Sequence, residues 1–361
     1  MCIRLVARCL RGLESVVAAE ILRLGLGTIT EMGHREVHFY TTRPDPAILR
    51  LPTADDVFLL AADGPDIGPG RASLTALSGL ATEIDAPALL ESRRLCGGPD
   101  GLGGGVEVSA SFLGKRAFNR YDLEDVVGRA LGARLGLDYH SRRTGDRPAP
   151  SDSGWRLSLD GRRSRLMLRL ADRPLHRRAY RQRTVPGSVH PPLASAMAQV
   201  ADLGTGHRVL DPCCGAATLL IEAASRQPDA VYRGFDLDPS ALGAARSNAT
   251  RQVTIERADA GTLPVPSSSV DRIVCNPPWG GQVSAQGSLT RGLTRLWTEL
   301  RRVLTPDGSA VILIPDAREL ATTIRTGFTP THVQQVRVSG RQSFIVRLSP
   351  DPGGSGGRSG R

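Results

Sequence analysis

The sequence predicts an α/β protein in two parts, the second of which contains a mainly parallel, seven-stranded sheet. Three observations support this fold class. A strand–helix–strand pattern opens the chain, helical and strand-like segments alternate from about residue 190, and a hairpin pattern closes the sequence. Strands that alternate with helices form parallel sheets covered on both faces, so we expect a doubly wound second half behind a smaller α+β front half.

The first 60 residues contain a small predicted α+β unit. A strand-like segment at 3–7 precedes a segment at 13–24 whose apolar residues recur with helical spacing. A second strand-like segment follows at 36–40. This order predicts a strand–helix–strand unit over residues 1–60.

Residues 61–172 form a second predicted unit. It contains in order a glycine-rich segment, a strand, a helix and a hairpin, at 94–105, 106–112, 122–137 and 155–170. The glycines have no fixed backbone preference and predict a mobile loop. We expect Asp122 to cap the helix, and the turn of the hairpin to fall at Asp160-Gly161.

The second half begins after an arginine-rich linker at 173–190 and extends over 191–349. Its helices are predicted at 193–203, 217–225, 239–248 and 289–304. Its strands are predicted at 208–210, 231–235, 253–256, 272–275 and 310–314, with a closing hairpin at 331–338 and 343–348. Asp238 and Pro239 suit the cap and first turn of the third helix. The glycine- and serine-rich tail, 350–361, predicts disorder.

Composition indicates a globular protein with a polyanionic partner. Of the 361 residues, 40% are hydrophobic and 23% charged, and no run reaches the ~18 apolar residues of a membrane span. With no signal peptide recognisable, we expect a cytoplasmic protein, a monomer by default. The net charge is +10, which favours nucleic acid, although Lys115 is the only lysine and a GC-rich genome could also produce such an arginine bias. The six cysteines include no C-x-x-C pair, so we expect no metal.

The first chemical signal is a strand that ends in Asp211 and runs through a short loop of small residues into a helix that begins near Thr218. Ligands of doubly wound sheets bind at the carboxyl ends of strands, and small residues let a cofactor approach the backbone. Cys213 and Gly215 lie in this loop, which lacks the G-x-G-x-x-G pattern of phosphate binding. The alternative is an ordinary strand-to-helix turn.

Acidic residues end the next two predicted strands. A ribose-binding carboxylate is expected roughly 20 residues after the glycine loop, and Asp236 follows Gly215 by about that distance. Asp238 suits a helix cap instead. Asp259 follows the third strand and could accept a hydrogen bond from an adenine amino group. The predicted cofactor-binding residues are Asp211, Cys213, Gly215, Thr218, Asp236, Leu237, Asp259, Ala260 and Asn276.

The most specific signal is the tetrapeptide Asn276-Pro277-Pro278-Trp279 after the fourth strand. An exocyclic amine of a nucleobase is a poor nucleophile because its lone pair is delocalised into the ring. The carboxamide oxygen of Asn276 and the carbonyl oxygen of Pro277 could accept both amine protons, and the prolines fix the backbone that aims them. Trp279 could stack on the base. We therefore predict these four residues as catalytic.

Together these motifs resemble THUMP-associated RNA guanine-N2 methyltransferases that use S-adenosylmethionine. Residues 211–224 resemble the family signature D-P-x-C-G-x-G-T-x-L-I-E-A-A, and 174–181 resemble its L-x-x-R-x-Y-R lead-in. The resemblance implies a Rossmann-like methyltransferase domain behind ferredoxin-like and THUMP-like domains. Ala217 replaces the second glycine of the signature, a change that we expect to be tolerated if its φ is negative.

The resemblance implies methyl transfer from S-adenosylmethionine to the N2 amine of guanosine in RNA, with tRNA as the expected substrate and rRNA as the alternative. The target base would be flipped out of its helix. Basic residues predicted to bind the RNA are Lys115, Arg116, Arg177, Arg178 and Arg181, and the alternative for the arginines is a solvated linker. Two other readings stay open: an adenine N6 methyltransferase, and a non-catalytic RNA-binding protein with a degenerate methyltransferase fold.

Overall fold

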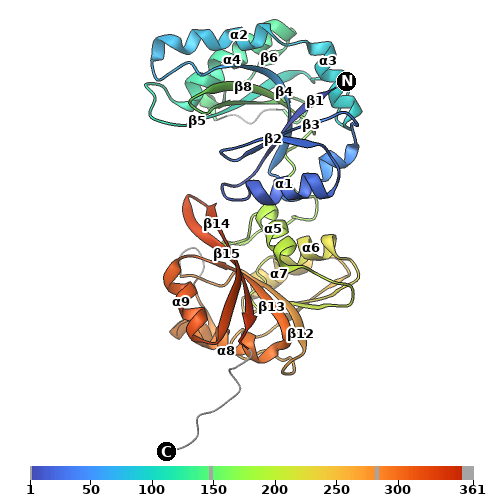
Figure 1. Cartoon of the computed structure of the whole chain (residues 1–361), viewed down its shortest axis with the longest axis vertical. Coiled ribbons are helices and arrows are strands. Elements are labelled where there is room, and N and C mark those ends of the chain that lie inside the picture. Colours follow the sequence, from blue (N-terminus) through green and yellow to red (C-terminus); the bar gives the residue numbers. More distant parts are fainter. Residues whose placement is uncertain (1, 146–148, 281–283, 352–361) are drawn as a thin grey trace, which may run out of the picture. The chain divides into compact units, whose positions relative to one another are not determined.

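The computed structural model describes residues 2–145, 149–280 and 284–351, which form two compact units (Figure 1). The first unit comprises the described residues of Met1–Cys9 and Glu14–His176, and the second those of Leu10–Leu13 and Arg177–Arg361. Among the described residues, none of the helices has both the length and the apolar character needed to cross a membrane.

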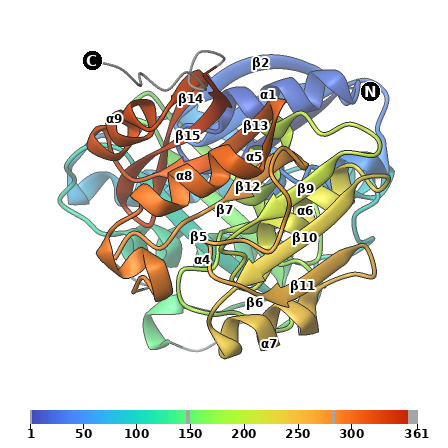
Figure 2. The ribbon, with the colours of Figure 1, turned by 90° about the horizontal axis from the view of Figure 1, so that it is seen from below.

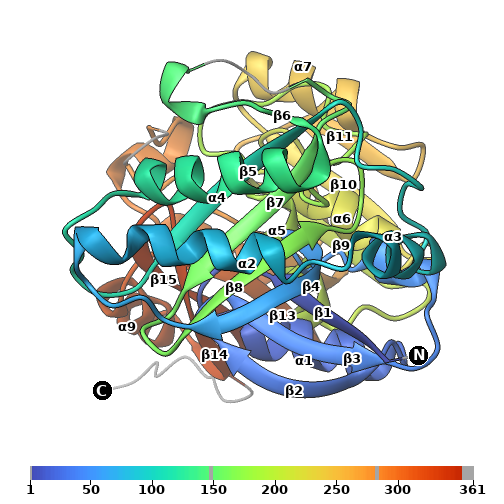
Figure 3. The same ribbon diagram turned by 90° about the horizontal axis from the view of Figure 1, so that it is seen from above.

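The first unit is built on one eight-stranded sheet in the order β2-β3-β1-β4-β8-β7-β5-β6 (Figure 3). Its strands are β1 Ile3–Arg8, β2 Thr28–Gly33, β3 Glu36–Thr41, β4 Asp56–Pro65, β5 Gly105–Phe112, β6 Asp138–Tyr139, β7 Ser153–Leu159 and β8 Arg163–Arg169. Its α-helices are α1 Glu14–Arg23, α2 Ser78–Thr82, α3 Ala86–Leu95 and α4 Arg120–Leu135. The predicted units 1–60 and 61–172 thus share a sheet, since β4 pairs with both β1 and β8.

The helix predicted to begin at Asp122 begins two residues earlier. Asn119 is the N-cap, and its side chain accepts hydrogen bonds from the backbone N–H groups of Tyr121 and Asp122. Asp122 instead accepts from the backbone N–H of Asn119, which completes a reciprocal capping box. The prediction named the wrong partner of this box because both residue types favour the N-cap position.

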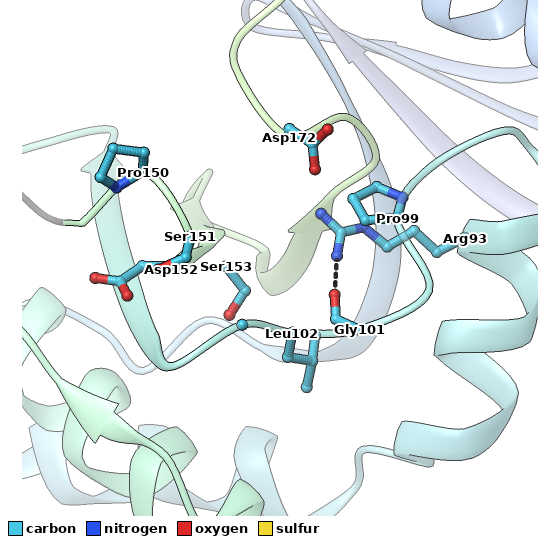
Figure 4. A pocket seen from close by; sticks show the side chains of 10 residues that line it. Arg93, Pro99, Gly101, Leu102, Pro150, Ser151, Asp152, Ser153 and Asp172 are labelled. Carbon is cyan, nitrogen blue, oxygen red and sulfur yellow. Dashed lines mark hydrogen bonds between the residues drawn. The ribbon is translucent and has the colours of Figure 1, made fainter.

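The glycine-rich segment 94–105, predicted to be mobile, is tied to its surroundings by Arg93. The guanidinium of this buried residue donates to the carbonyl oxygens of Gly101 (2.7 Å), Leu170 (3.2 Å) and Ala171 (3.3 Å). With Pro99 and 150–153 it lines a pocket of about 240 Å³ that Asp172 also borders (Figure 4). A single buried cation thus organises a segment whose composition alone predicts no structure.

The second unit contains the predicted seven-stranded sheet, in the order β11-β10-β9-β12-β13-β15-β14 (Figure 2). The strands are β9 Arg208–Asp211, β10 Val231–Asp236, β11 Val253–Arg257, β12 Val270–Cys275, β13 Leu304–Ile314, β14 Phe328–Val338 and β15 Arg341–Pro350. Strand β15 lies between β13 and β14 and pairs antiparallel with both. The hairpin was predicted, but this insertion was not.

Helices cover both faces of this sheet. They are α5 Pro191–Ala201, α6 Thr218–Arg226, α7 Pro239–Asn248, α8 Thr294–Val303 and α9 Ala317–Arg325. Alternate residues of the central strands, such as Leu210 and Ile273, form one core with Trp297 of α8. Their buried neighbours Val209 and Val274 point to the opposite face, where α5 packs against β12 and β13.

The helix predicted at 289–304 is divided in two. A short 3₁₀ helix spans Gly287–Arg291, and α8 begins at Thr294. Gly292 separates them with a φ of 111°, a conformation that cannot continue a helix and that glycine adopts without a steric penalty. The sequence pattern therefore located the apolar face but not the interruption.

Two glycines in helices of the first unit should respond in opposite ways to alanine. A Cβ atom at Gly128 of α4 would overlap the ring of Tyr139, whose hydroxyl is held by Asp125, whereas a Cβ at Gly79 of α2 meets no atom within 4 Å. We expect Gly128→Ala to lower the free energy of unfolding by about 1–3 kcal/mol despite its better helix propensity. The matched control Gly79→Ala should raise it by about 0.5–1 kcal/mol. Thermal unfolding measures both, and a stabilised Gly128→Ala variant would contradict the packing described here.

Candidate functional site

The predicted site residues of the second unit gather at one edge of its sheet. Strands β9, β10 and β12 are parallel neighbours and end at Asp211, Asp236 and Cys275, the residue before Asn276 (Figure 2). Strand β11 pairs with β10, and Asp259 lies two residues beyond its end. The chain reverses its direction of progress across the sheet between β9 and β12, the position where doubly wound sheets bind ligands.

The loop after β9 is cross-linked to the end of β10. The backbone N–H of Gly215 donates to Oδ2 of Asp236 (2.9 Å), and the N–H of Cys214 donates to the carbonyl of Phe235 (2.8 Å). Oδ1 of Asp236 accepts from the N–H of Asp238 (3.0 Å). Each carboxylate oxygen therefore retains one acceptor position, which two ribose hydroxyl groups could fill. The predicted ribose role of Asp236 is compatible with this geometry.

Asp211 differs from Asp236 because it is 1% exposed. Its Oδ1 accepts from the N–H of Cys213 (3.1 Å). Burial, with a smaller contribution from the Asp236 charge, raises the pKa of Asp211 to about 8. Its hydrogen bond is to the loop, so its effect on a cofactor would be to position Cys213.

We expected alanine to be tolerated at position 217 if its φ were negative. The observed φ of Ala217 is 63°, so this condition is not met. It is the N-cap of α6 in the left-handed conformation, which costs a residue with a Cβ roughly 1–2 kcal/mol. Its methyl group is fully buried and contributes packing that a glycine would lose. The backbone of Ala217 is therefore strained where the signature has glycine, and burial of the methyl group offsets part of the free-energy cost.

The next residue, Thr218, carries a hydroxyl group that is buried without a hydrogen-bond partner among the described residues. It opens α6, whose first N–H groups also lack helical partners. A buried hydroxyl normally has a partner. An unsatisfied hydroxyl beside a loop of small residues fits the polar end of S-adenosylmethionine, so the residues present suit the cofactor that the sequence implies.

Asp259 already has partners on both oxygens. Oδ1 accepts from the N–H of Gly261 (2.9 Å) and from the hydroxyl of Ser288 (2.5 Å), and Oδ2 accepts from the N–H of Ser288 (2.8 Å). Ala260 beside it is buried, and Leu237 lies near Gly287 of the same short helix. Nothing in the sequence pattern pointed to Ser288.

The tetrapeptide continues β12 with Asn276 half-buried and Pro277 buried. The Asn276 Nδ2 donates to the carbonyl of Gly187 (3.4 Å), and its Oδ1 accepts from the indole N–H of Trp279 (3.4 Å). These bonds orient the carboxamide and leave one acceptor position on Oδ1. The Trp279 ring packs in part against the core beneath α8, and its stacking role stays a prediction.

Residues within 177–190 are bonded to α6 and α7. Arg178 Nε and the Tyr180 hydroxyl both donate to Oε1 of the buried Glu222 on α6, at 2.8 Å each. Asn248 at the end of α7 accepts from the N–H groups of Gln182 and Arg183. It also donates to the carbonyl of Ala216 (3.1 Å), so one side chain joins this segment to the loop after β9.

Two of the predicted RNA-binding residues are held in ion pairs. Arg116 makes a two-bond pair with Asp66 (2.6 and 2.8 Å), and its side chain is 5% exposed. Arg178 is paired with Glu222, as described above. These ion pairs occupy both guanidinium groups, so a phosphate would have to compete with a carboxylate, and the RNA contact of both residues stays a prediction.

Lys115 and Arg177 are exposed, and Arg181 is half-buried, with an Nε that has no partner among the described residues. Their predicted contact with RNA is compatible with these positions. Within the part of the chain that the structure describes, no group of three His, Cys, Asp or Glu side chains is arranged to hold a metal ion. The pocket around Arg93 (Figure 4) contains none of the predicted site residues.

Two family models match parts of the chain. Residues 178–343 match the RMKL-like methyltransferase domain, and residues 4–51 match the RlmL ferredoxin-like domain. The tRNA (guanine(6)-N2)-methyltransferase of Thermus thermophilus is 33% identical over 247 residues, 66% of this chain and 70% of the relative. The U6 snRNA (guanine-N(2))-methyltransferase THUMPD2 of Mus musculus is 31% identical over 176 residues, 45% of this chain but only 33% of that protein.

Solved structures agree with this grouping. The crystal structure of TrmN from Thermus thermophilus has a TM-score of 0.76 at 29% identity and covers 96% of this chain and 99% of that one. SMU.472, a methyltransferase crystallised with SAH, has a TM-score of 0.72 at 16% identity, which supports the fold. The chain therefore belongs to the family of RMKL-like, S-adenosylmethionine-dependent methyltransferases.

Proposed function

We propose that the protein methylates the N2 amine of a guanosine in tRNA, and that this guanosine is at position 6. Support for the substrate comes from the Thermus thermophilus tRNA (guanine(6)-N2)-methyltransferase, of which this chain covers 70%. Support from the site comes from Asn276, whose carboxamide is oriented by Gly187 and Trp279 at the end of β12. The oriented Asn276 is the observation that carries the proposal.

The chemical task of Asn276 follows from its remaining acceptor position. The N2 amine of guanine donates its lone pair to the ring and is a weak nucleophile. Hydrogen bonds from its two protons to Asn276 Oδ1 and the Pro277 carbonyl would draw the nitrogen toward tetrahedral geometry and return the lone pair to it. Because Nδ2 donates to Gly187, the oxygen and not the amino group of Asn276 is presented to the amine.

S-adenosylmethionine, when bound, supplies an electrophilic methyl group. Asp236, Leu237, Thr218 and Gly215 would hold it at the ends of β9 and β10, and Asp259 would bind its adenine. The protein has no need of a strong base, since positioning of the two reactants supplies much of the rate enhancement. The amine proton is lost to solvent after transfer.

The RNA would be gripped by exposed cations. Of the predicted residues, Lys115 and Arg177 are exposed, whereas Arg181 is half-buried and its Nε is buried. Many other arginines are committed to carboxylates, including Arg116, Arg163, Arg165 and Arg178. The 46 lysine and arginine residues therefore overstate the number of cations that are free to meet phosphates, whereas the net charge of +10 remains after every such pair is cancelled.

Substitution of Asn276 tests its role in the chemistry. Asn276→Ala should lower kcat about 100- to 1,000-fold, because the transition state loses a positioned acceptor, with little change in the Kd for tRNA. Asn276→Asp keeps an acceptor oxygen and should retain more activity than the alanine variant. Full activity of Asn276→Ala in a methyl-transfer assay would eliminate the proposed role.

The product identifies the substrate. Mass spectrometry of nucleosides from tRNA and rRNA, isolated from cells with and without the gene, should show loss of N2-methylguanosine from tRNA alone. Sequencing of the affected tRNA should place the lost methyl group at position 6. Loss of N6-methyladenosine, or loss confined to rRNA, would refute the proposal. Failure of the pure protein to bind S-adenosylmethionine, with or without RNA, would favour a non-catalytic RNA-binding protein.

Exposed and paired cations should behave differently toward RNA. Replacing Lys115 and Arg177 together by alanine should weaken tRNA binding and reduce the slope of log K against log salt by about 0.7–0.9 per lost phosphate contact. Arg178→Ala should leave the slope unchanged and lower the free energy of unfolding by about 3 kcal/mol, because the buried Glu222 loses its paired cation and keeps the Tyr180 hydroxyl as a donor. An unchanged slope in the double variant would show that both cations are solvated surface residues that do not contact phosphates.

A further inference from the structure

A segment after the tetrapeptide is bonded to the carboxylate of Asp259, the residue predicted to bind adenine. Ser288, in the 3₁₀ helix Gly287–Arg291, donates its backbone N–H to Oδ2 of Asp259 and its hydroxyl to Oδ1. The N–H of Gly261 is a third donor, also to Oδ1. Three donors thus converge on one carboxylate from two segments of the chain.

The contact between these segments is too close for larger residues. A Cβ at Gly287, whose φ is 56°, would overlap Asp259 Oδ2 and approach Leu237 Cδ1 to 2.6 Å. A Cβ at Gly261 would overlap the Ser288 hydroxyl. Leu289, the residue after Ser288, is 4% exposed and belongs to the core formed with α8. The short helix is therefore anchored on one side by the core and on the other by Asp259.

The three donors leave one hydrogen-bond acceptor position of the Asp259 carboxylate unused. A carboxylate oxygen accepts about two hydrogen bonds. Both positions on Oδ1 are used, by Gly261 and Ser288, and one of the two on Oδ2 is used by Ser288. Burial raises the pKa of Asp259, but the bonds from Ser288 and Gly261 outweigh it and hold the pKa below its usual value. The remaining acceptor position, on Oδ2, therefore belongs to a carboxylate that is ionised and held in one orientation.

We propose that Ser288 is a positioning residue of the cofactor site: it fixes the Asp259 carboxylate so that the free position of Oδ2 accepts the adenine amino group. The same bonds tie the segment that follows Asn276-Pro277-Pro278-Trp279 to the occupied cofactor site. Binding of the cofactor therefore stabilises the short helix Gly287–Arg291. The proposal rests on the proposed function only in taking S-adenosylmethionine as the ligand, and it is independent of the RNA.

Binding of two nucleosides tests the role of Ser288 without any methyl transfer. S-adenosylhomocysteine carries an amine at position 6 of its purine, whereas S-inosylhomocysteine carries an oxygen there, which a carboxylate acceptor repels. Wild type should bind the adenosyl compound at least tenfold more tightly in calorimetry. Ser288→Ala should lose about tenfold in affinity for the adenosyl compound and most of the discrimination between the two.

The matched control is Thr290→Ala. Thr290 lies in the same short helix and donates to the carbonyl of Gly287, but it does not touch Asp259. Both affinities should stay within about twofold of wild type in this variant, as expected of a surface change. A Ser288→Ala variant that loses affinity for both compounds equally, or that binds the adenosyl compound as well as or better than wild type does, would overturn the proposal.

A double-mutant cycle separates action through Asp259 from a general loss of structure. If Ser288 acts through this carboxylate, Ser288→Ala should change affinity for S-adenosylhomocysteine by less than about twofold in an Asp259→Ala background. A further tenfold loss in that background would show an independent role and reject the proposal. Failure of wild type to bind either compound would instead count against the proposed function. Thermal unfolding of each variant checks that the second unit is folded.

Discussion

The hydrogen bond from the Gly215 N–H to Asp236 Oδ2 is the constraint on which the rest of the site depends. It fixes the loop after β9 against the end of β10, the two strand ends between which a cofactor would lie. It also aims the Asp236 carboxylate, because Oδ1 is bound at the same time by the Asp238 N–H. The loop must turn sharply to make this bond, which accounts for the left-handed conformations of Gly215 and Ala217. Strain in the loop and orientation of the acid are thus two results of one contact.

A second set of bonds extends this order to the acceptor side. Asn248 joins the Ala216 carbonyl to the backbone of Gln182 and Arg183, and a few residues later the Gly187 carbonyl orients Asn276. The segment between α5 and the front half is therefore a structural part of the catalytic unit. Its arginine content had suggested an RNA-binding linker. The buried Glu222 explains part of that content differently, since an unpaired carboxylate in that position would be costly.

The sequence was sufficient to predict the strands of the second unit and the four residue groups at their ends, because these depend on local periodicity and on motif spacing. Helix α7 and its Asp238 cap are examples. It was insufficient where a long-range contact decides the outcome. Neither the pairing of Arg116 with Asp66 nor that of Ser288 with Asp259 leaves a periodic signal. The positive φ of Ala217 could not be predicted from the sequence either. An alanine in place of the family glycine is compatible both with a left-handed residue and with a relaxed turn.

These contacts also explain how one edge of a sheet can serve two reactants. Asp236 and Asp259 end neighbouring strands, yet each is bound by a different segment: Asp236 by the loop after β9, and Asp259 by the helix that follows the tetrapeptide. Asp236 is therefore coupled to the loop after β9, and Asp259 to the short helix Gly287–Arg291. A cofactor that contacts both acids would connect the two segments without any contact between them. Because coupling between two equilibria is reciprocal, a cofactor that binds Asp259 would stabilise the helix Gly287–Arg291, just as that helix orients the carboxylate.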